Sequence, residues 1–237
     1  NIMALPKLNT PTYDLELPSN GKKIQYRPFL VKEQKILMLA QDTKNETDIA
    51  NAMGKLVSSC TFGNVDTKTS PMFDIEYVFL KVRSKSVGSS VDLMVTCPDD
   101  DETKAKCTID LDDVEVNMLE DHTNEIQIND MVKIVFRYPV LDDMKNLKDN
   151  ATDVQRVFHI LGKCIQEIHF GDEVYQRNDM TVKDVDEFID QLTSEQFERL
   201  VEFFNSMPKL RHVIKITNPK TKVESEVVLE GLESFLG

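Results

Sequence analysis

The residues best able to do chemistry in this sequence are its four cysteines and four histidines, so metal binding is considered first. Cys97 and Cys107 stand on opposite sides of an expected hairpin, with nine residues between them. A zinc knuckle usually holds a Cys-x-x-Cys pair in one tight turn, because both thiolates must reach one ion. Cys60 and Cys164 are distant in sequence. The spacing therefore favours buried free thiols over a zinc site or a disulfide.

The histidines do not supply a metal site or a catalytic set. His159 and His169 are ten residues apart on an expected helix, which separates them by about 15 Å along its axis. The sequence contains no HExxH or GxSxG motif, and the phrase SVGSS lacks the glycines and lysine of a phosphate-binding loop. These patterns predict a protein that is not an enzyme and that holds no cofactor and no metal.

Consecutive carboxylates form the most acidic stretch, at Asp99, Asp100, Asp101 and Glu102. They lack the alternating spacing and distal glutamate of a calcium-binding loop. A general acid or base would need a carboxyl group in an apolar pocket, which nothing in the sequence indicates. The stretch therefore predicts a solvated hairpin tip, whose outer end is a candidate contact point for a partner.

Phenylalanines near the C-terminus have two interpretations. Phe197 and Phe204 lie seven residues apart with Leu200 and Val201 between them, the spacing of one helical face. That face either belongs to the core or docks a partner helix. The candidate partner contacts are Asp99, Asp100, Asp101, Phe197, Phe204 and Phe235.

One apolar helix is expected to organise the fold, over residues 71–87. Its apolar residues lie on more than one helical face, which is typical of a helix covered by other elements. They are Phe73, Ile75, Tyr77, Val78, Phe79, Leu80 and Val82. This helix runs into a strand, an acidic turn and a return strand that ends near residue 116.

The remaining chain alternates between hairpins and helices. A hairpin is expected at 12–30, two helices at 31–63 with Ile36, Leu37, Leu39 and Ala40 on the inner side of the first, and strands at 125–138. An amphipathic helix is expected at 154–171, then helices after the N-caps Thr181 and Thr193, then a last hairpin.

The order of these elements predicts an α+β fold, in which antiparallel β-hairpins alternate with helix pairs around the central buried helix 71–87. Two domains are expected. Residues 3–148 would form an N-terminal α+β domain with two or three hairpins, and residues 149–237 a mainly helical region that ends in a hairpin.

Three hairpins resemble one another, because each has a strand, a proline, a polar turn and a return strand. The prolines are Pro18, Pro98 and Pro219. Internal duplication would explain the pattern. The alternative is that proline often occupies the second position of turns.

Composition limits the class of partner. The net charge is −13, with 41% hydrophobic and 29% charged residues. Such acidity disfavours nucleic acid, whose phosphates need lysine and arginine. It suits a basic protein partner or serves only solubility. No apolar run approaches the roughly 20 residues of a membrane span, and the scattered cysteines indicate a reducing setting. Asn1 and Ile2 are interpreted as a tag remnant before a native start at Met3.

Three stretches resemble a known family, at residues 4–40, 58–97 and 109–116. The more specific phrases in them are YRPFLVKEQKILML at 26–39 and FDIEYVFLKVRSKSVG at 73–88. They are similar to the baseplate hub proteins of T-even-type contractile-tailed bacteriophages and cyanophages. The resemblance implies a non-enzymatic hub subunit or hub assembly factor that acts through protein–protein contacts in tail and baseplate morphogenesis.

The same resemblance implies other hub proteins or the tail tape-measure protein as partners, with neither nucleic acid nor membrane. It implies a location in the host cytoplasm during assembly or in the virion baseplate hub. An alternative function is a small metal-binding or regulatory module built on the Cys97 and Cys107 hairpin.

Overall fold

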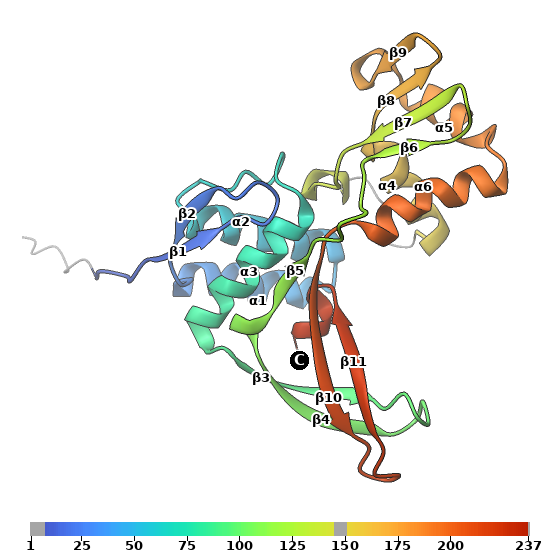
Figure 1. Cartoon of the computed structure of the whole chain (residues 1–237). Coiled ribbons are helices and arrows are strands. Elements are labelled where there is room, and N and C mark those ends of the chain that lie inside the picture. The colour runs from blue at the N-terminus through green and yellow to red at the C-terminus, as the bar shows by residue number, and fades with distance from the viewer. Residues whose placement is uncertain (1–7, 145–150, 237) are drawn as a thin grey trace, which may run out of the picture. The chain divides into compact units, whose positions relative to one another are not determined.

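The computed structural model describes residues 8–144 and 151–236, apart from the side chain of Glu46. The expected start at Met3 and most of the polar stretch before residue 151 lie outside these residues. The chain folds into two compact units (Figure 1). Unit 1 combines the chain up to Thr67 with Phe73–Glu115 and the segment from Leu210 onward, and unit 2 combines Lys68–Met72 with Val116–Lys209.

Neither unit is one continuous segment. The last hairpin belongs to unit 1, and the strands after residue 116 belong to unit 2. The two compact units therefore do not divide at residue 149. That residues 3–148 and 149–237 fold as separate domains stays a prediction. Within the described residues, small antiparallel sheets alternate with helices, so the α+β class is confirmed.

Unit 1 is built from three hairpins and three helices within its described residues. The strands are β1 (Tyr13–Glu16), β2 (Lys23–Tyr26), β3 (Ser90–Thr96), β4 (Lys104–Asp110), β10 (Lys209–Thr217) and β11 (Glu224–Glu230). The helices are α1 (Val31–Thr43), α2 (Glu46–Cys60) and α3 (Met72–Val87), with short 3₁₀ turns η1 (Leu111–Asp113) and η4 (Leu232–Phe235).

The central helix α3 is buried as predicted. Ile75, Val78, Leu80 and Val82 are fully covered, although they do not lie on one helical face. Burying each such side chain contributes about 1.5–3 kcal/mol, so α3 supplies much of the apolar core of unit 1.

Buried polar side chains tie α3 to the β1–β2 hairpin and to the turn that follows β4. The carboxylate of Asp74 accepts hydrogen bonds from the backbone N–H and hydroxyl of Ser19, in the β1–β2 turn. The ammonium of Lys81 donates to the carbonyls of Asp112 (2.8 Å) and Val114 (3.0 Å), just after β4. Burial raises the pKa of Asp74 and lowers that of Lys81.

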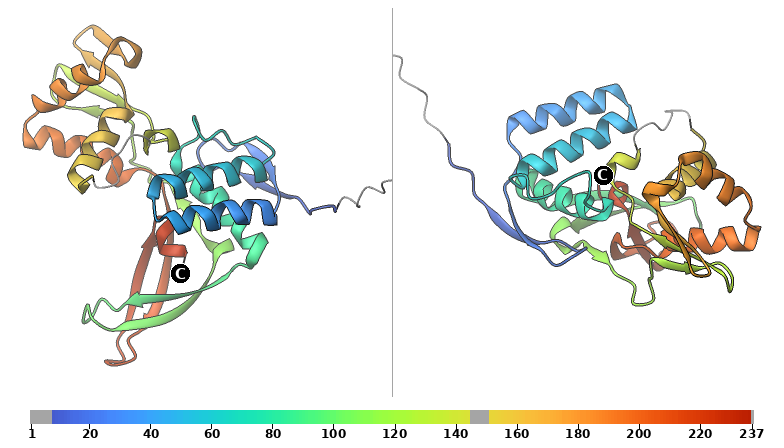
Figure 2. Two further views of the ribbon diagram at one scale, coloured as in Figure 1. Left: turned by 180° about the vertical axis from the view of Figure 1, so that it is seen from behind. Right: turned by 90° about the horizontal axis from the view of Figure 1, so that it is seen from above.

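Helices α1 and α2 lie side by side as a helical hairpin (Figure 2). Helix α1 has a different inner side from the one expected. Ala40 is buried, but Leu39 and Ile36 are exposed, and Glu33 is buried in their place. Glu33 turns inward because it pairs with Arg27, six residues before it.

The three proline turns share one geometry. The N–H groups of Gly21, Asp101 and Lys222 each donate to the carbonyl four residues earlier, and the three bonds are all 2.9 Å. Each donor residue has a positive φ, of 67°, 54° and 67°. The common geometry supports internal duplication, which stays a prediction.

Unit 2 has an antiparallel sheet of order β6-β7-β8-β9 covered by helices. Its strands are β6 (Glu125–Gln127), β7 (Val132–Phe136), β8 (Ile165–Phe170) and β9 (Glu173–Gln176). Its helices are α4 (Asp153–Cys164), α5 (Val182–Asp190) and α6 (Ser194–Ser206), with 3₁₀ turns η2 (Leu141–Met144) and η3 (Arg177–Asp179); β5 (Glu115–Asn117) spans the boundary between the units. Thr181 and Thr193 cap α5 and α6 as predicted.

The expected helix at 154–171 is wrong in its second half. Helix α4 ends at Cys164, and the next residue begins strand β8, which pairs with β7 and β9. Ile165 and Ile168 are buried in the sheet, opposite Phe136 and Ile134 of β7. Backbone pairing on both sides of β8 overrides the helical spacing. His159 and His169 consequently lie on different elements.

Candidate functional site

An arginine at the end of the first hairpin organises a buried polar cluster in unit 1. The backbone N–H of Arg27 donates to the carbonyl of Cys60, the last residue of α2 (2.9 Å). The guanidinium donates to the carbonyl of Pro28 (2.9 Å) and pairs with the carboxylate of Glu33 (2.9 Å). These bonds join the β1–β2 hairpin to the start of α1 and the end of α2.

Glu33 has further donors at the same site. Its carboxylate accepts from the backbone N–H of Leu30 (2.7 Å) and from the hydroxyl of Ser59 (2.9 Å). Burial alone would raise the pKa of Glu33, but the bonds from Arg27, Leu30 and Ser59 outweigh it and lower the pKa to about 2. We call Arg27, Glu33, Ser59 and Cys60 the Arg27 cluster.

Unit 2 contains the same arrangement around Arg137, which follows β7. Its backbone N–H donates to the carbonyl of Cys164 at the end of α4 (2.9 Å). Its guanidinium donates to the carbonyl of Tyr138 (3.0 Å) and pairs with Asp143 (2.7 Å). Asp143 also accepts from the backbone N–H of Val140 (2.9 Å). We call Arg137, Asp143 and Cys164 the Arg137 cluster.

Neither arginine cluster was identified from the sequence. The available signal was an arginine directly after an alternating strand, with an acidic residue six positions later in both places. These perturbed carboxylates are held by arginines and backbone donors. Their arrangement fixes the chain locally and gives the carboxylates a structural role.

The acidic turn after β3 is the next predicted site, and it meets the last hairpin. The side-chain amide of Asn218 donates to Asp99 (2.9 Å) and Asp100 (3.2 Å), and the hydroxyl of Thr221 donates to Asp99. Hydrogen bonds from Thr221 and Asn218 lower the pKa of Asp99. Hydrogen bonds led by those from Thr103 lower the pKa of Asp100. We call Asp99, Asp100, Asn218 and Thr221 the hairpin-tip cluster.

Within the predicted acidic set, the structure separates two kinds of carboxylate. Asp99 and Asp100 are engaged in holding two hairpin tips together, and Asn218 between them is buried. Asp101 occupies the turn position with positive φ and is exposed. Of the three, Asp101 is the residue whose side chain is most available to a partner.

The predicted phenylalanines lie in different surroundings. Phe197 and Phe204 are on α6 and pack against the core of unit 2 while staying partly exposed. Phe197 stacks on Phe158, with ring centroids 4.9 Å apart. Phe235 is fully buried in unit 1. Contact through the ring of Phe235 would require local opening of η4.

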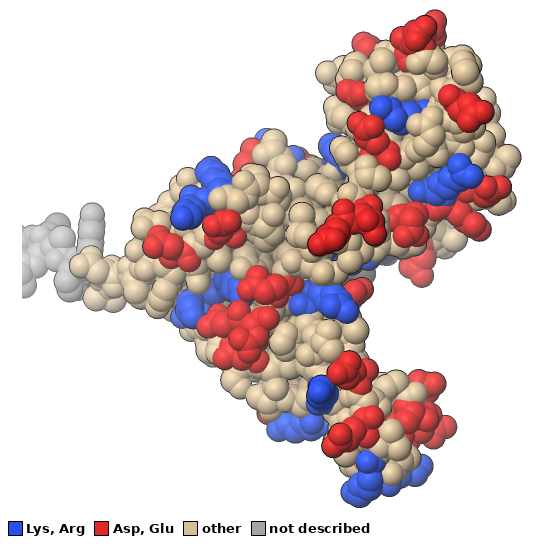
Figure 3. All heavy atoms as spheres, in the orientation of Figure 1, with Lys and Arg blue, Asp and Glu red and all other residues tan. Residues whose placement is uncertain are grey.

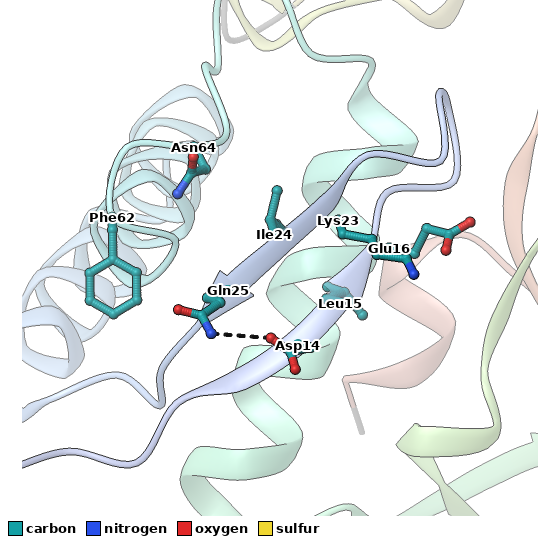
Figure 4. Close-up of a pocket in the computed structure, with 8 residues that line it drawn as sticks. All are labelled: Asp14, Leu15, Glu16, Lys23, Ile24, Gln25, Phe62 and Asn64. Atoms are coloured by element: carbon teal, nitrogen blue, oxygen red, sulfur yellow. Dashed lines mark hydrogen bonds between the residues drawn. The ribbon is translucent and has the colours of Figure 1, made fainter.

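A shallow groove of about 810 Å³ lies beside the first hairpin (Figure 4). Phe62 and Asn64 come from the loop after α2, and strands β1 and β2 supply the other lining residues, including Asp14 and Gln25. Phe62 is largely exposed and has a φ of 57°. Such a backbone conformation costs about 1–2 kcal/mol for a residue with a Cβ. The groove offers an exposed ring beside polar side chains, which suits contact with another chain.

The cysteine hairpin does not have the geometry expected of a metal module. The register places Cys107 opposite Leu93, whereas Cys97 follows β3 and its N–H donates to Thr103 (2.7 Å). The expectation that Cys97 and Cys107 face each other is therefore wrong. Among the described residues, no group of three or more His, Cys, Asp or Glu side chains is placed to hold a metal ion.

All four thiols are free, and burial is confirmed for Cys60, Cys97 and Cys164, while Cys107 is half-buried. Burial raises the pKa of Cys60 to about 11 and that of Cys164 to about 12. In the described part of the chain, no helix combines the length and apolarity needed to span a bilayer. Acidic and basic side chains are interspersed on the face in Figure 3, where basic ones form only small groups.

Comparison with known proteins identifies the family. The family model described as T4 bacteriophage base plate protein matches residues 10–237. The chain belongs to this family. Its place among phage baseplate proteins, expected from the resemblance, is thereby confirmed.

A curated relative is the baseplate hub assembly protein gp26 of Enterobacteria phage T4. It is 23% identical over 230 residues, which cover 94% of this chain and 97% of the relative. No solved structure matches the chain significantly. The similarity therefore extends over both units of this baseplate family member.

Proposed function

We propose that this baseplate family member is a non-enzymatic hub assembly protein or hub subunit that acts through protein–protein contacts. Its partners are other hub proteins or the tail tape-measure protein, with neither nucleic acid nor a membrane involved. It works in the host cytoplasm during assembly, and a hub subunit would stay in the virion.

The observation that carries this proposal is the nearly full-length similarity to a protein named for hub assembly. Two structural features support a function through protein–protein contacts. The carboxylate of Glu33, whose pKa is strongly lowered, pairs with the internal Arg27 and so has a structural role. The groove in Figure 4 presents the exposed ring of Phe62 to solvent.

The candidate contacts remain the hairpin tip with Asp99, Asp100 and Asp101, and the phenylalanines Phe197, Phe204 and Phe235. Their positions rank them for testing. Asp101 is exposed and Phe197 and Phe204 are partly exposed, so substitutions there can alter binding directly. Substituting Asp99, Asp100 or Phe235 also disturbs internal contacts.

Deleting the gene for this chain from its phage tests the proposal. We expect infected cells to accumulate tails or tubes without a complete hub, and the intact gene supplied in trans should restore baseplates. Normal baseplates and normal phage yield without the chain would contradict a role in hub assembly.

Mass spectrometry of purified virions separates the two versions of the function. Stoichiometric peptide coverage of this chain would identify a permanent subunit. Its absence from virions, together with presence in assembly intermediates from infected cells, would identify a transient assembly factor.

A further inference from the structure

The segment of residues 118–123, which connects β5 to β6 in unit 2, has few contacts of its own. Met118 and Leu119 are 50% and 48% exposed, and no residue of the segment is fully buried. Among the described hydrogen bonds, the one between Nδ1 of His122 and the hydroxyl of Ser206 (3.0 Å) joins the segment to a helix. Ser206 is the last residue of α6. One side chain therefore holds the segment to the end of α6.

The bonds of Ser206 decide which ring nitrogen of His122 carries the proton. A serine hydroxyl has one hydrogen, and that of Ser206 donates to the carbonyl of Glu202, one helical turn earlier (2.7 Å). The hydroxyl oxygen accepts in turn, so Nδ1–H of His122 is the donor to Ser206. The neutral ring consequently has an unprotonated Nε2.

Nε2 of His122 is buried and has no hydrogen-bond partner among the described residues. The ring lies against two aromatic side chains, with centroid distances of 5.6 Å to Tyr138 and 5.2 Å to Phe203. A proton on Nε2 would place a positive charge and a donor without an acceptor at this position, and both are costly away from water. Burial accordingly lowers the pKa of His122.

The charged groups near the ring do not compensate a positive charge on it. The ionisable side chains on the elements around His122 are those of Glu120, Asp121, Arg137, Tyr138, Glu202 and Lys209. Arg137 is paired with Asp143 (2.7 Å), and Lys209 donates to the carbonyl of Asn205 (3.3 Å). Glu120, Asp121 and Glu202 are exposed to water. Burial is thus the cause of the lowered pKa.

We propose that His122 is an acid-sensitive latch between residues 118–123 and the C-terminal end of α6. In the closed form, neutral His122 donates from Nδ1 to Ser206 and packs against Tyr138 and Phe203. Uptake of a proton from water at Nε2 releases the imidazolium into solvent, separates the segment from α6 and uncovers the two aromatic rings. The latch goes beyond the proposed function and does not depend on it.

Acid opens the latch because the open form binds the proton more tightly. The pKa of His122 in the closed form lies below 6.5, the ordinary value for a hydrated histidine. The stability of the closed form is therefore fully present above pH 6.5 and declines as the pH falls below 6.5.

Nuclear magnetic resonance of the full chain with ¹⁵N-labelled histidine tests the protonation of the ring. At about pH 8, we expect Nδ1 of His122 to carry the hydrogen and Nε2 to carry none. On acidification, Nε2 should take up its proton below pH 6.5. A hydrogen on Nε2 at about pH 8, or a titration midpoint at or above 6.5, would overturn the inference.

Amide hydrogen exchange of residues 118–123 measures the opening itself. After correction for the chemical effect of pH on exchange, we expect the opening equilibrium of the wild type to rise at least about threefold from about pH 8 to about pH 5. His122→Phe keeps an aromatic ring and cannot take up a proton, so its opening should not depend on pH. Opening that is independent of pH in the wild type, or equally dependent in His122→Phe, would contradict the latch.

A second variant removes the acceptor and leaves the imidazole in place. We expect Ser206→Ala to increase exchange of residues 118–123 already at about pH 8 and to weaken its dependence on pH, since the bond that closes the latch is lost. The matched control is Ser194→Ala, because Ser194 is an exposed serine at the start of α6. Unchanged exchange in Ser206→Ala, or the same increase in the control, would refute the assignment. Urea unfolding checks that each variant folds.

Discussion

The two arginine clusters are alike in their bonds and differ in their burial. Each arginine donates its backbone N–H to the carbonyl of a buried cysteine, and each pairs with an acidic residue six positions later. The side chain of Arg27 is only 10% exposed, whereas that of Arg137 is 35% exposed. Glu33 also accepts a hydrogen bond from a serine hydroxyl, and no described side-chain hydroxyl donates to Asp143.

The same arrangement of hydrogen bonds and an ion pair therefore occurs with different burial, and it holds elements of different length. Glu33 lies in the first turn of α1, a helix of 13 residues, whereas Asp143 belongs to a single 3₁₀ turn of four residues. The deeper pair therefore fixes a longer element. Glu33 and Asp143 are both buried, so the clusters differ in the exposure of their arginines. Removing one partner of a buried pair leaves an uncompensated charge, and a pair whose cation is partly hydrated loses less.

Removing the arginines should give the largest effect and the clearest asymmetry. We expect Arg27→Met to lower the free energy of unfolding by about 3–5 kcal/mol, because Glu33 stays buried and keeps only the exposed Lys32, at 3.5 Å, as a cation. Arg137→Met should cost about 1.5–3 kcal/mol, since the side chain of Arg137 is 35% exposed and its ion pair is partly hydrated. Urea unfolding followed by circular dichroism measures both. Equal losses would show that burial does not separate the clusters.

Acid should weaken the Arg27 cluster in a defined range of pH. The pKa of Glu33 falls from 4.5 to about 2 on folding, so its contribution is complete above pH 4.5 and disappears as the pH falls through 2. The lowering corresponds to about 3 kcal/mol at neutral pH. We expect the stability difference between wild type and Glu33→Gln to shrink over this range. A difference independent of pH from 7 to 2 would contradict the assignment.

The hairpin-tip cluster extends the comparison to an arrangement without an arginine. Asn218 is buried, and its amide joins both carboxylates to the last hairpin, with the hydroxyl of Thr221 as a second donor to Asp99. We expect Asn218→Ala to destabilise unit 1 by about 1–2 kcal/mol, because its hydrogen bonds are lost. Hydrogen exchange of the β10–β11 amides measures the change, and unchanged exchange there would contradict it. Lys220→Ala, an exposed change in the same turn, is the control.

The rates at which Cys60 and Cys164 react with a thiol reagent should reveal which cluster opens locally in an arginine variant. We expect the overall stability of these variants to change little. Cys60 belongs to the Arg27 cluster and Cys164 to the Arg137 cluster, and both are buried. We expect Arg27→Lys to accelerate labelling of Cys60 and not of Cys164, and Arg137→Lys to do the reverse, because lysine cannot replace the fork of guanidinium donors. Half-buried Cys107 is the internal reference. Equal acceleration at both cysteines would mean that the clusters open together.

Local signals explain which elements could be predicted from sequence. Thr181 and Thr193 accept the capping bonds that their spacing indicates, and the burial of α3 follows from apolar residues on several faces. The proline turns were recognisable for the same reason, since the bonds that form them span four residues. In each case the deciding contacts lie within one element or one turn.

The remaining features depend on partners far away in sequence. Ile165 and Ile168 suit a helix or a strand equally, and only pairing with β7 decides for the strand. Glu33, and not Leu39, faces inward, since it pairs with Arg27, whose backbone is itself bonded to Cys60, 33 residues further on. The hydrogen bond between Asn218 and Asp99 joins residues 119 positions apart, so the sequence alone could not predict the hairpin-tip cluster. The candidate contact residues were chosen by type, and their accessibility needed the fold.

The return of the last hairpin to unit 1 has a consequence during protein synthesis. At about 5–20 residues per second, the 119 positions that separate Asn218 from Asp99 take roughly 6–24 s to translate. Until Asn218 has been translated, Asp99 and Asp100 of the nascent chain lack its amide as a hydrogen-bond donor. Most of unit 2 is translated during the same interval. Unit 1, whose first segments precede unit 2, is thus completed only after the last hairpin has been translated.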